Sequence, residues 1–310
     1  MKLHTKEEFT NLILLTSAYK NIPESAIRRD YYIVMILKNL MQSEYADVCV
    51  FKGGTSISKC YQNSIERFSE DIDLTYMPSN ELGDNQVEKK LKSIEKALSL
   101  GFESEKINGE RNRRNKSAWF WFKDKKDQIK LEIGSSVRPH PYAKRTLKTY
   151  IHEYLEVNGF DEEIKAYELT EIKINVLDIT RTFLDKIMAV KRHAICNTLN
   201  KKVRHIYDIV QLYKLEDIQV FLEDKVALKK IIQITKQTDS FYLQKRNLPK
   251  EFNPLEPYLF SEWKYKLDKQ IRRRYETLHE DLLYTDQKQS FDEVFNVFDS
   301  IDKIFRDINE

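Results

Sequence analysis

The spacing of hydrophobic positions in the first 177 residues changes several times, which predicts both helices and strands. Helical spacing runs through 23–42, and a charged helix is expected over 85–100. Thr5 and Glu8 have the spacing of a capping box, which predicts the start of an earlier helix. Short apolar or alternating runs predict strands at 47–51, 71–76, 102–106, 118–123, 128–134 and 171–177.

The pattern changes again near residue 178. Residues 135–160 are mixed and contain a Pro-His-Pro loop, whereas 179–194 and 203–212 have helical spacing, and the last third of the chain also reads as helical. We therefore expect an α+β fold in two lobes. Residues 1–177 would form a mixed β-sheet with flanking helices, and residues 178–310 would form a helical domain.

Composition narrows the class of protein. Hydrophobic residues make up 41% of the 310-residue chain and charged residues 33%, as in a globular domain. The three cysteines are scattered, which argues against a disulfide framework or a zinc site. The N-terminus is polar and no apolar run approaches the roughly 20 residues of a membrane span. We expect a cytoplasmic protein without a membrane partner.

The net charge of +3 says little about partners, but basic residues gather in local runs. Such runs usually form solvated faces, and they indicate a track for phosphates only where a nucleic-acid site is argued independently. The runs lie at 111–116, 123–126, 201–204 and 272–274.

A glycine pair follows the first predicted strand. Gly53 and Gly54 allow a tight turn into a helix that Thr55 is expected to cap, and backbone N–H groups at such a turn can approach an anion closely. Ser56 could add a hydroxyl, and Lys59 lies one turn further on. This corner is a candidate site for the triphosphate of a nucleotide.

Two carboxylates then share one face of a strand. Asp71 and Asp73 are two residues apart, so both side chains project the same way. Adjacent carboxylates repel unless a cation lies between them, and oxygen ligands suit Mg²⁺ or Mn²⁺. Glu132 alternates with Leu131 and Ile133 and would supply a third carboxylate from a neighbouring strand. It is our candidate for activating an acceptor hydroxyl.

Each feature has an ordinary alternative. A glycine pair can be only a turn, an aspartate pair can be a surface feature, and Glu132 alone can be an exposed strand residue. The order of glycine turn, helix, aspartate pair and later acidic strand makes a joint coincidence much less frequent.

This order resembles the polymerase-β-type nucleotidyltransferase superfamily, although the stretch from Gly54 to Asp71 is longer than in its commonest versions. It is more similar to the AbiEii-like toxins, in which KGGTS, a following SK and RFSEDIDL are characteristic. TFLDK at 182–186 and RHIYD at 204–208 resemble two further motifs of that family. The four motifs lie in the family's order.

The resemblance implies that Lys186 and Asp208 also belong to the active site. Lys186 could reach a phosphate as a point charge, with Asp208 orienting it, and the alternative is a helix–helix ion pair between the two. Lys59 and Arg67 could bind phosphate, or instead brace the strand by pairing with Glu70.

The implied activity is transfer of a nucleoside monophosphate from an NTP to an acceptor hydroxyl. Relatives that act as toxins on the 3′ end of tRNA make tRNA a plausible acceptor, in a toxin–antitoxin or phage-defence system. A cognate antitoxin, often a winged-helix regulator, is also implied. The alternatives are nucleotidylation of a protein or small molecule, and a nucleotide-binding regulator with an idle site.

Overall fold

The chain folds into two compact units in this computed structural model, which describes residues 2–61, 63–79, 82–243, 248–249, 252–281, 283 and 289–309. Unit 1 comprises residues 1–62, 68–135 and 142–177. Unit 2 comprises residues 63–67, 136–141 and 178–310. Among the described helices, none is both long and apolar enough to cross a membrane.

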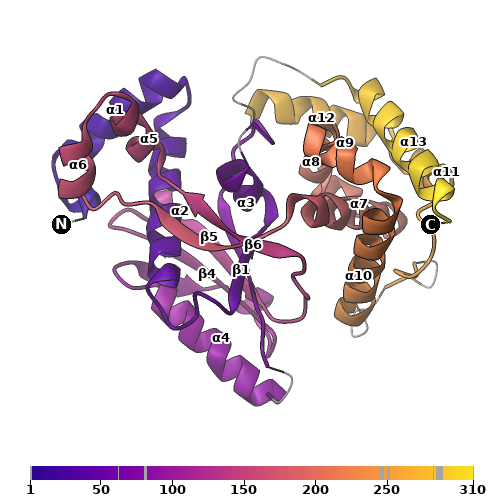
Figure 1. The fold of residues 1–310 in the computed structure, drawn as a ribbon, viewed down its shortest axis with the longest axis horizontal. Coiled ribbons are helices and arrows are strands. Elements are labelled where there is room, and N and C mark those ends of the chain that lie inside the picture. The colour runs from indigo at the N-terminus through magenta and orange to yellow at the C-terminus, as the bar shows by residue number, and fades with distance from the viewer. Residues whose placement is uncertain are drawn as a thin grey trace. The chain divides into compact units, whose positions relative to one another are not determined.

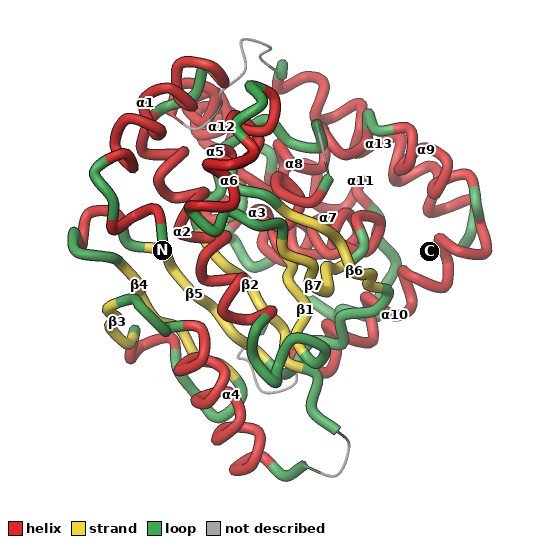
Figure 2. Tube along the Cα trace, turned by 60° about the vertical axis from the view of Figure 1, so that its left-hand side comes forward, coloured by secondary structure: helices red, strands yellow, loops and turns green. Residues whose placement is uncertain are grey.

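Unit 1 is built on a mixed seven-stranded sheet with the strand order β3-β4-β5-β2-β1-β7-β6, which Figure 2 shows side by side. Four adjacent pairs are antiparallel, whereas β2 pairs with β5 and β1 pairs with β7 in parallel. This sheet confirms the predicted α+β class. The strands are β1 (Cys49–Lys52), β2 (Asp71–Tyr76), β3 (Glu103–Lys106), β4 (Asn115–Trp121), β5 (Ile129–Gly134), β6 (Tyr142–Leu147) and β7 (Ile172–Leu177).

The centre of this sheet positions the predicted acidic residues. β1 and β2 are antiparallel neighbours, with Lys52 opposite Asp73. β2 and β5 are parallel neighbours, with Asp71 opposite Lys130 and Asp73 opposite Glu132. The third acidic residue therefore lies on a strand directly beside the aspartate pair, as the sequence predicts.

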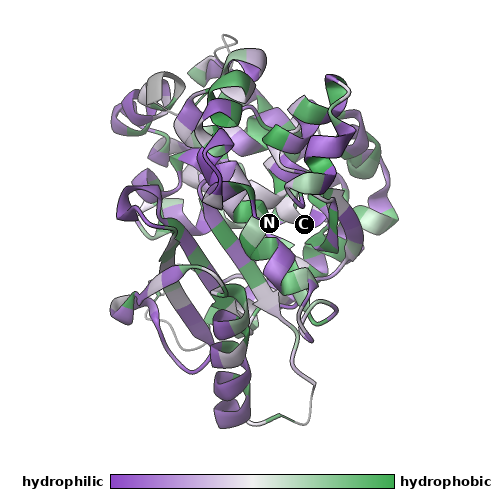
Figure 3. Cartoon of the chain, turned by 90° about the vertical axis from the view of Figure 1, so that its left-hand side faces the viewer, coloured by the Kyte–Doolittle hydropathy of each residue, from purple (hydrophilic) through white to green (hydrophobic). Residues whose placement is uncertain are grey.

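The described part of unit 1 has six α-helices, of which α2 contacts both the sheet and three of the others. Its buried residues include Ile27, Tyr31, Val34 and Leu37, which follow the predicted spacing, and it packs against α1, α4, β5 and β7. In Figure 3, α4 is mostly hydrophilic with a few hydrophobic bands, which suits a helix with one buried stripe. The helices are α1 (Glu8–Lys20), α2 (Glu24–Met41), α3 (Gly53–Cys60), α4 (Asp84–Leu98), α5 (Tyr150–Val157) and α6 (Asp161–Ala166).

Two predicted helix caps are wrong. Thr5 ends a short 3-10 helix, η1 (Leu3–Thr5), and its hydroxyl donates to the Lys2 carbonyl, while α1 begins three residues later. Thr55 does not cap α3, because that helix already begins at Gly53. In both places the hydroxyl has another partner, which the short-range motif does not reveal.

Unit 2 is helical after residue 178, and its core is formed by α7 and α8. α7 packs against α8, α9, α10 and α11, while α8 also contacts α12 and α13. Figure 1 shows these elements from dark pink to yellow. They are α7 (Ile179–Ile195), α8 (Val203–Tyr213), α9 (Glu216–Glu223), α10 (Lys225–Leu243), α11 (Phe260–Trp263), α12 (Lys269–Asp281) and α13 (Phe291–Asp307), with the 3-10 helices η4 (Leu199–Lys201) and η5 (Lys264–Lys266).

Candidate active site

The turn from β1 into α3 brings backbone and carboxylate into contact. Gly53 has a φ of +86°, a conformation that residues with a side chain rarely adopt. A Cβ at this position would lie 2.2 Å from Oδ2 of Asp73. Gly53 is therefore needed both for the turn and for the space that the Asp73 carboxylate occupies.

Two hydroxyls of α3 stabilise this turn. The Thr55 hydroxyl lies 2.8 Å from Oγ of Ser69 and 2.5 Å from the Asp71 carbonyl oxygen, so it ties α3 to the start of β2. Ser56 is fully buried and donates to the Gly53 carbonyl over 2.9 Å. The first-turn amides of Gly53 and Gly54 remain as the donors that a helix N-terminus offers to an anion.

Asp71, Asp73 and Glu132 form what we call the carboxylate face. On β2 the two aspartates are partly exposed, while Ile72 between them is buried. On β5 Lys130 and Glu132 are partly exposed and alternate with buried hydrophobic residues. The strand alternation therefore brings three carboxylates and one lysine to the same side of two adjacent strands.

The carboxylate face disfavours its own negative charge. Burial, together with the nearby charges of Asp73 and Glu132, raises the pKa of Asp71 from 3.8 to about 6, although Lys130 acts in the opposite direction. Like charges held close together produce such a shift, and a bound cation relieves it. This electrostatic strain fits a divalent metal, and the three oxygen ligands are of the kind that Mg²⁺ or Mn²⁺ prefers.

Glu132 has a partner other than the aspartates. Its Oε1 lies 2.6 Å from Nζ of Lys130, which also lies 2.8 Å from Oε2 of Glu110. A metal ion needs ligand atoms that lie close together. Among the described residues, one group of three has all its ligand atoms within 4.8 Å of one another, and it is not the carboxylate face. A cation held by these three carboxylates would therefore compete with Lys130 for Glu132.

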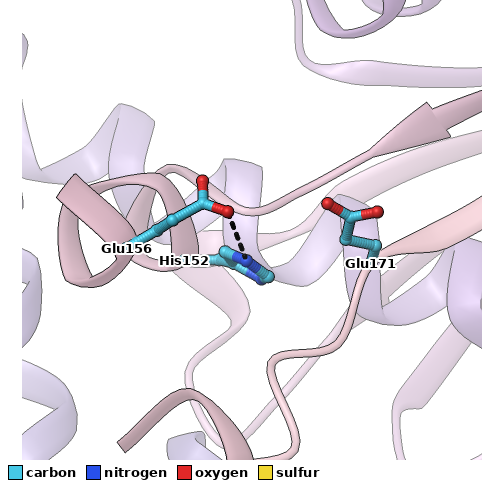
Figure 4. A group of neighbouring side chains, drawn as sticks. All are labelled: His152, Glu156 and Glu171. Carbon is cyan, nitrogen blue, oxygen red and sulfur yellow. Dashed lines mark ion pairs between the residues drawn. The ribbon is translucent and has the colours of Figure 1, made fainter. Parts of the chain in front are cut away.

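The group that does meet the spacing consists of His152, Glu156 and Glu171 (Figure 4). Nζ of Lys148 lies 2.8 Å from both glutamates, so one ammonium already offsets part of their negative charge. His152 Nδ1 also contacts the Leu169 carbonyl. We interpret this group as an ion-paired surface cluster that joins α5 to the start of β7.

Lys59 forms a buried ion pair with Asp30. Its Nζ lies 2.5 Å from Oδ1 of Asp30 on α2 and 3.9 Å from the centre of the Tyr150 ring. The backbone N–H of Tyr150 donates to the other oxygen of Asp30 over 2.7 Å. These contacts anchor the end of α3, and no local pattern predicted Asp30 as the partner of Lys59.

One of the two alternatives for Lys59 and Arg67, pairing with Glu70, is wrong. Glu70 instead pairs with Arg29 of α2. Arg67 belongs to unit 2 and pairs with Asp208. The motif could not reveal these partners, because Arg29 and Asp208 lie on helices that are remote from it in sequence.

In unit 2, Asp208 binds two cations. Its carboxylate accepts hydrogen bonds from Nε and Nη2 of Arg67 over 2.6 and 2.7 Å, and from Nζ of Lys186 over 2.7 Å. The three side chains are almost fully buried. Burial alone would raise the pKa of Asp208, but Arg67 and Lys186 outweigh it and lower that pKa to about 2. The ion pair between α7 and α8 is therefore present, with Arg67 as a third member that the sequence did not predict.

The basic run at 111–116 forms ion pairs within unit 1. Arg111 donates to both oxygens of Glu95 over 2.6 and 2.7 Å, Arg114 pairs with Asp84, and Lys116 lies 3.3 Å from Glu88. The three acidic partners are all on α4. The run at 111–116 therefore mainly holds α4 near β4, which makes it a poor candidate for a phosphate track.

Comparisons with known proteins identify the chain's relatives. The family model described as the nucleotidyl transferase AbiEii toxin of type IV toxin–antitoxin systems matches residues 35–297. Among proteins with curated descriptions, none matches the chain.

Two solved structures match the chain at low identity and with TM-scores below 0.5. JHP933 from Helicobacter pylori is 18% identical with a TM-score of 0.39, covering 83% of this chain and 95% of that one. The nucleotidyltransferase toxin MenT4 from Mycobacterium tuberculosis H37Rv is 16% identical with a TM-score of 0.46, covering 96% and 99%. The family match spans most of the sequence, including all the motifs discussed above. The chain belongs to the AbiEii family of nucleotidyltransferase toxins of type IV toxin–antitoxin systems.

Proposed function

We propose that the chain is a metal-dependent nucleotidyltransferase that transfers a nucleoside monophosphate from an NTP to the 3′ end of tRNA. One observation carries the catalytic part of this proposal. The aspartates of β2 and Glu132 of β5 share one side of adjacent strands, and the Gly53 turn lies directly against Asp73.

Different residues would bind the metal ion and the phosphates. Asp71, Asp73 and Glu132 would hold the ion, and Gly53 and Gly54 would offer backbone N–H groups to the phosphates. A bound Mg²⁺ or Mn²⁺ supplies positive charge to the phosphate oxygens. The buried hydroxyls of Thr55 and Ser56 support the turn from within.

In the transfer, an oxygen of the acceptor hydroxyl attacks the α-phosphorus of the NTP. The bond from that phosphorus to the β-phosphate oxygen breaks, and pyrophosphate leaves with the electron pair. Glu132 assists removal of the hydroxyl proton. From the family motif alone we propose that Lys186 takes part in the reaction, and within unit 2 the Asp208 carboxylate holds its ammonium.

Exposed basic residues on neighbouring segments of unit 2 support RNA as the acceptor. η4 packs against α12, and Nζ of Lys266 lies 2.6 Å from Oδ1 of Asn197, so segments 69 residues apart in sequence come together. Lysine and arginine side chains that gather in this way attract a phosphate backbone. The exposed basic residues of these segments are Lys201, Arg204, Lys264, Lys269, Arg273 and Arg274.

The remaining parts of the proposal follow from family membership. A type IV toxin implies a cognate antitoxin, for which we propose a winged-helix regulator, and a role in growth arrest or phage defence. Both the NTP and tRNA are found in the cytoplasm, where we expect the protein to act.

The experiment is a label-transfer assay in which the NTP is varied and tRNA is the acceptor. Purified protein is incubated with Mg²⁺, each α-labelled NTP in turn and total bacterial tRNA, beside Asp71→Ala and a reaction with EDTA. We expect label on tRNA only with the wild type and Mg²⁺, and with a preference for one nucleotide.

Two other outcomes separate the rival functions. Label on protein or on a small molecule, with none on tRNA, would replace the acceptor but keep the reaction. Nucleotide binding without any transfer would contradict the enzyme and favour a binding regulator.

A further inference from the structure

The carboxylate face contains a cation of its own. Lys130 lies opposite Asp71 in the parallel pairing of β2 and β5, two residues before Glu132 on the same side of β5. Its side chain is 18% exposed, so the ammonium is held within this surface and not extended into solvent. A lysine at this position is unexpected for a site that is meant to attract a divalent cation.

Lys130 bridges two carboxylates, one in the carboxylate face and one outside it. Its Nζ lies 2.6 Å from Glu132 of the carboxylate face and 2.8 Å from Glu110. Glu110 ends the 3-10 helix η2 (Asn108–Glu110), outside the β2–β5 pair, and its side chain is 44% exposed. Lys130 therefore has an alternative partner that it can keep when Glu132 is withdrawn.

We propose that Lys130 is a resident counter-cation that positions Glu132 in the metal-free protein, and that Glu110 retains this lysine when Glu132 exchanges it for a divalent metal ion. This inference rests on the proposed function, because it assumes that the carboxylate face binds the metal. Lys130 thereby lowers the affinity for metal and stabilises the metal-free carboxylates. Glu110 reduces this effect, because it draws Lys130 away from Glu132.

The geometry predicts opposite effects on metal binding for removing Lys130 and for removing Glu110. Without Lys130, Glu132 is released and the site is more negative, so metal binding becomes tighter. Without Glu110, Lys130 pairs only with the carboxylate face. It then competes more strongly with the metal ion for Glu132, and metal binding becomes weaker.

The test is a titration of the full-length, nucleotide-free protein with Mn²⁺, in which free Mn²⁺ is measured by electron paramagnetic resonance. Lys130→Met should lower the dissociation constant by about tenfold, and Glu110→Gln should raise it several-fold. The chain offers a matched control, because Lys125 and Glu105 form an exposed ion pair in the same unit. Lys125→Met and Glu105→Gln should stay within about twofold of the wild type.

Asp71→Asn separates the two proposals. If it binds Mn²⁺ as the wild type does, the carboxylate face is not the metal site and both proposals fail. If it loses binding while Lys130→Met and Glu110→Gln behave like their controls, only the role of Lys130 is overturned. Circular dichroism checks the fold of each variant, and Glu110→Gln, at an exposed position, decides the question should Lys130→Met not fold.

Discussion

Asp71 carries a charge at neutral pH that the folded chain disfavours. Its pKa is raised to about 6 by burial and by Asp73 and Glu132, whereas the unfolded value is 3.8. The folded state thus keeps a proton that the unfolded chain has lost between those two values, so stability falls as the pH rises from about 4 to about 6. Above pH 6 the full penalty is present.

Asp71→Asn removes this penalty and should stabilise the metal-free protein. A shift of about two pKa units corresponds to at most about 3 kcal/mol, and solvent screening at this partly exposed side chain reduces it to about 1–2 kcal/mol. We expect a higher melting temperature than wild type at pH 7.5 in EDTA and little difference at pH 4. Equal melting temperatures at both values would contradict the raised pKa.

Asp208 shows the opposite linkage. Because its pKa is lowered to about 2, its contribution to stability is fully present above the unfolded value of 3.8 and is lost as the pH falls towards 2. Asp208→Asn leaves Arg67 and Lys186 buried without a counter-charge, which should cost about 3–5 kcal/mol of unfolding free energy at pH 7.

Urea unfolding measures that loss, with Asp292→Asn as the control. Asp292 forms an ion pair with Arg272 in the same unit, but its side chain is 77% exposed, so its replacement should cost less than about 1 kcal/mol. Similar losses for both variants would show that the buried carboxylate is not specially required. The gap between wild type and Asp208→Asn should narrow between pH 4 and pH 2.

At the scale of elements, the turn between β1 and α3 is the most sensitive part of unit 1. Gly53→Ala would place a methyl group 2.2 Å from the Asp73 carboxylate and strain a backbone φ of +86°. We expect about 1–3 kcal/mol of destabilisation and a loss of nucleotidyl transfer that is greater than the folded fraction explains. Gly109→Ala is the matched control, because a Cβ there meets no atom within 4 Å.

Thermal unfolding and the transfer assay, run on the same two samples, separate these effects. Full activity in a folded Gly53→Ala protein would show that the contact with Asp73 is dispensable. A comparable loss in Gly109→Ala would show that the assay reports general sensitivity to alanine.

How well each element could be predicted depends on its burial. β2 and β5 alternate buried and partly exposed residues, so their faces, and the placement of Asp71, Asp73 and Glu132, follow from the sequence. β6 is an edge strand whose residues are mostly exposed, so it carries no alternation and falls in the stretch with a mixed pattern. The short helix α5 lies in the same stretch, and the short helix α6 follows it, and neither was predicted.

At the scale of the whole chain, local sequence could not show which partners are brought together from a distance. Asp208 meets Arg67 across 141 residues, and Lys59 meets Asp30 of α2, yet no short-range pattern marks either pair. Lys130 is different, because the alternation of β5 already places it on the side of Glu132. Its significance depends on Glu110, which only the folded structure shows as its second partner.

Membership of the AbiEii family gives the class of reaction, and the carboxylate face gives the residues that we propose perform it. The unit 2 residues Lys186 and Asp208 enter the proposal through the family motifs and through their buried ion pair.

The most direct measurement of the central claim compares transfer rates for single changes in the carboxylate face. Asp73→Asn is assayed with α-labelled NTP, Mg²⁺ and tRNA beside the wild type and Asp47→Asn, which changes an exposed aspartate of unit 1 whose side chain is 78% exposed. We predict a rate at least about 10³-fold below wild type for Asp73→Asn and a rate within about twofold for Asp47→Asn. Transfer at the wild-type rate by a folded Asp73→Asn protein would contradict the account.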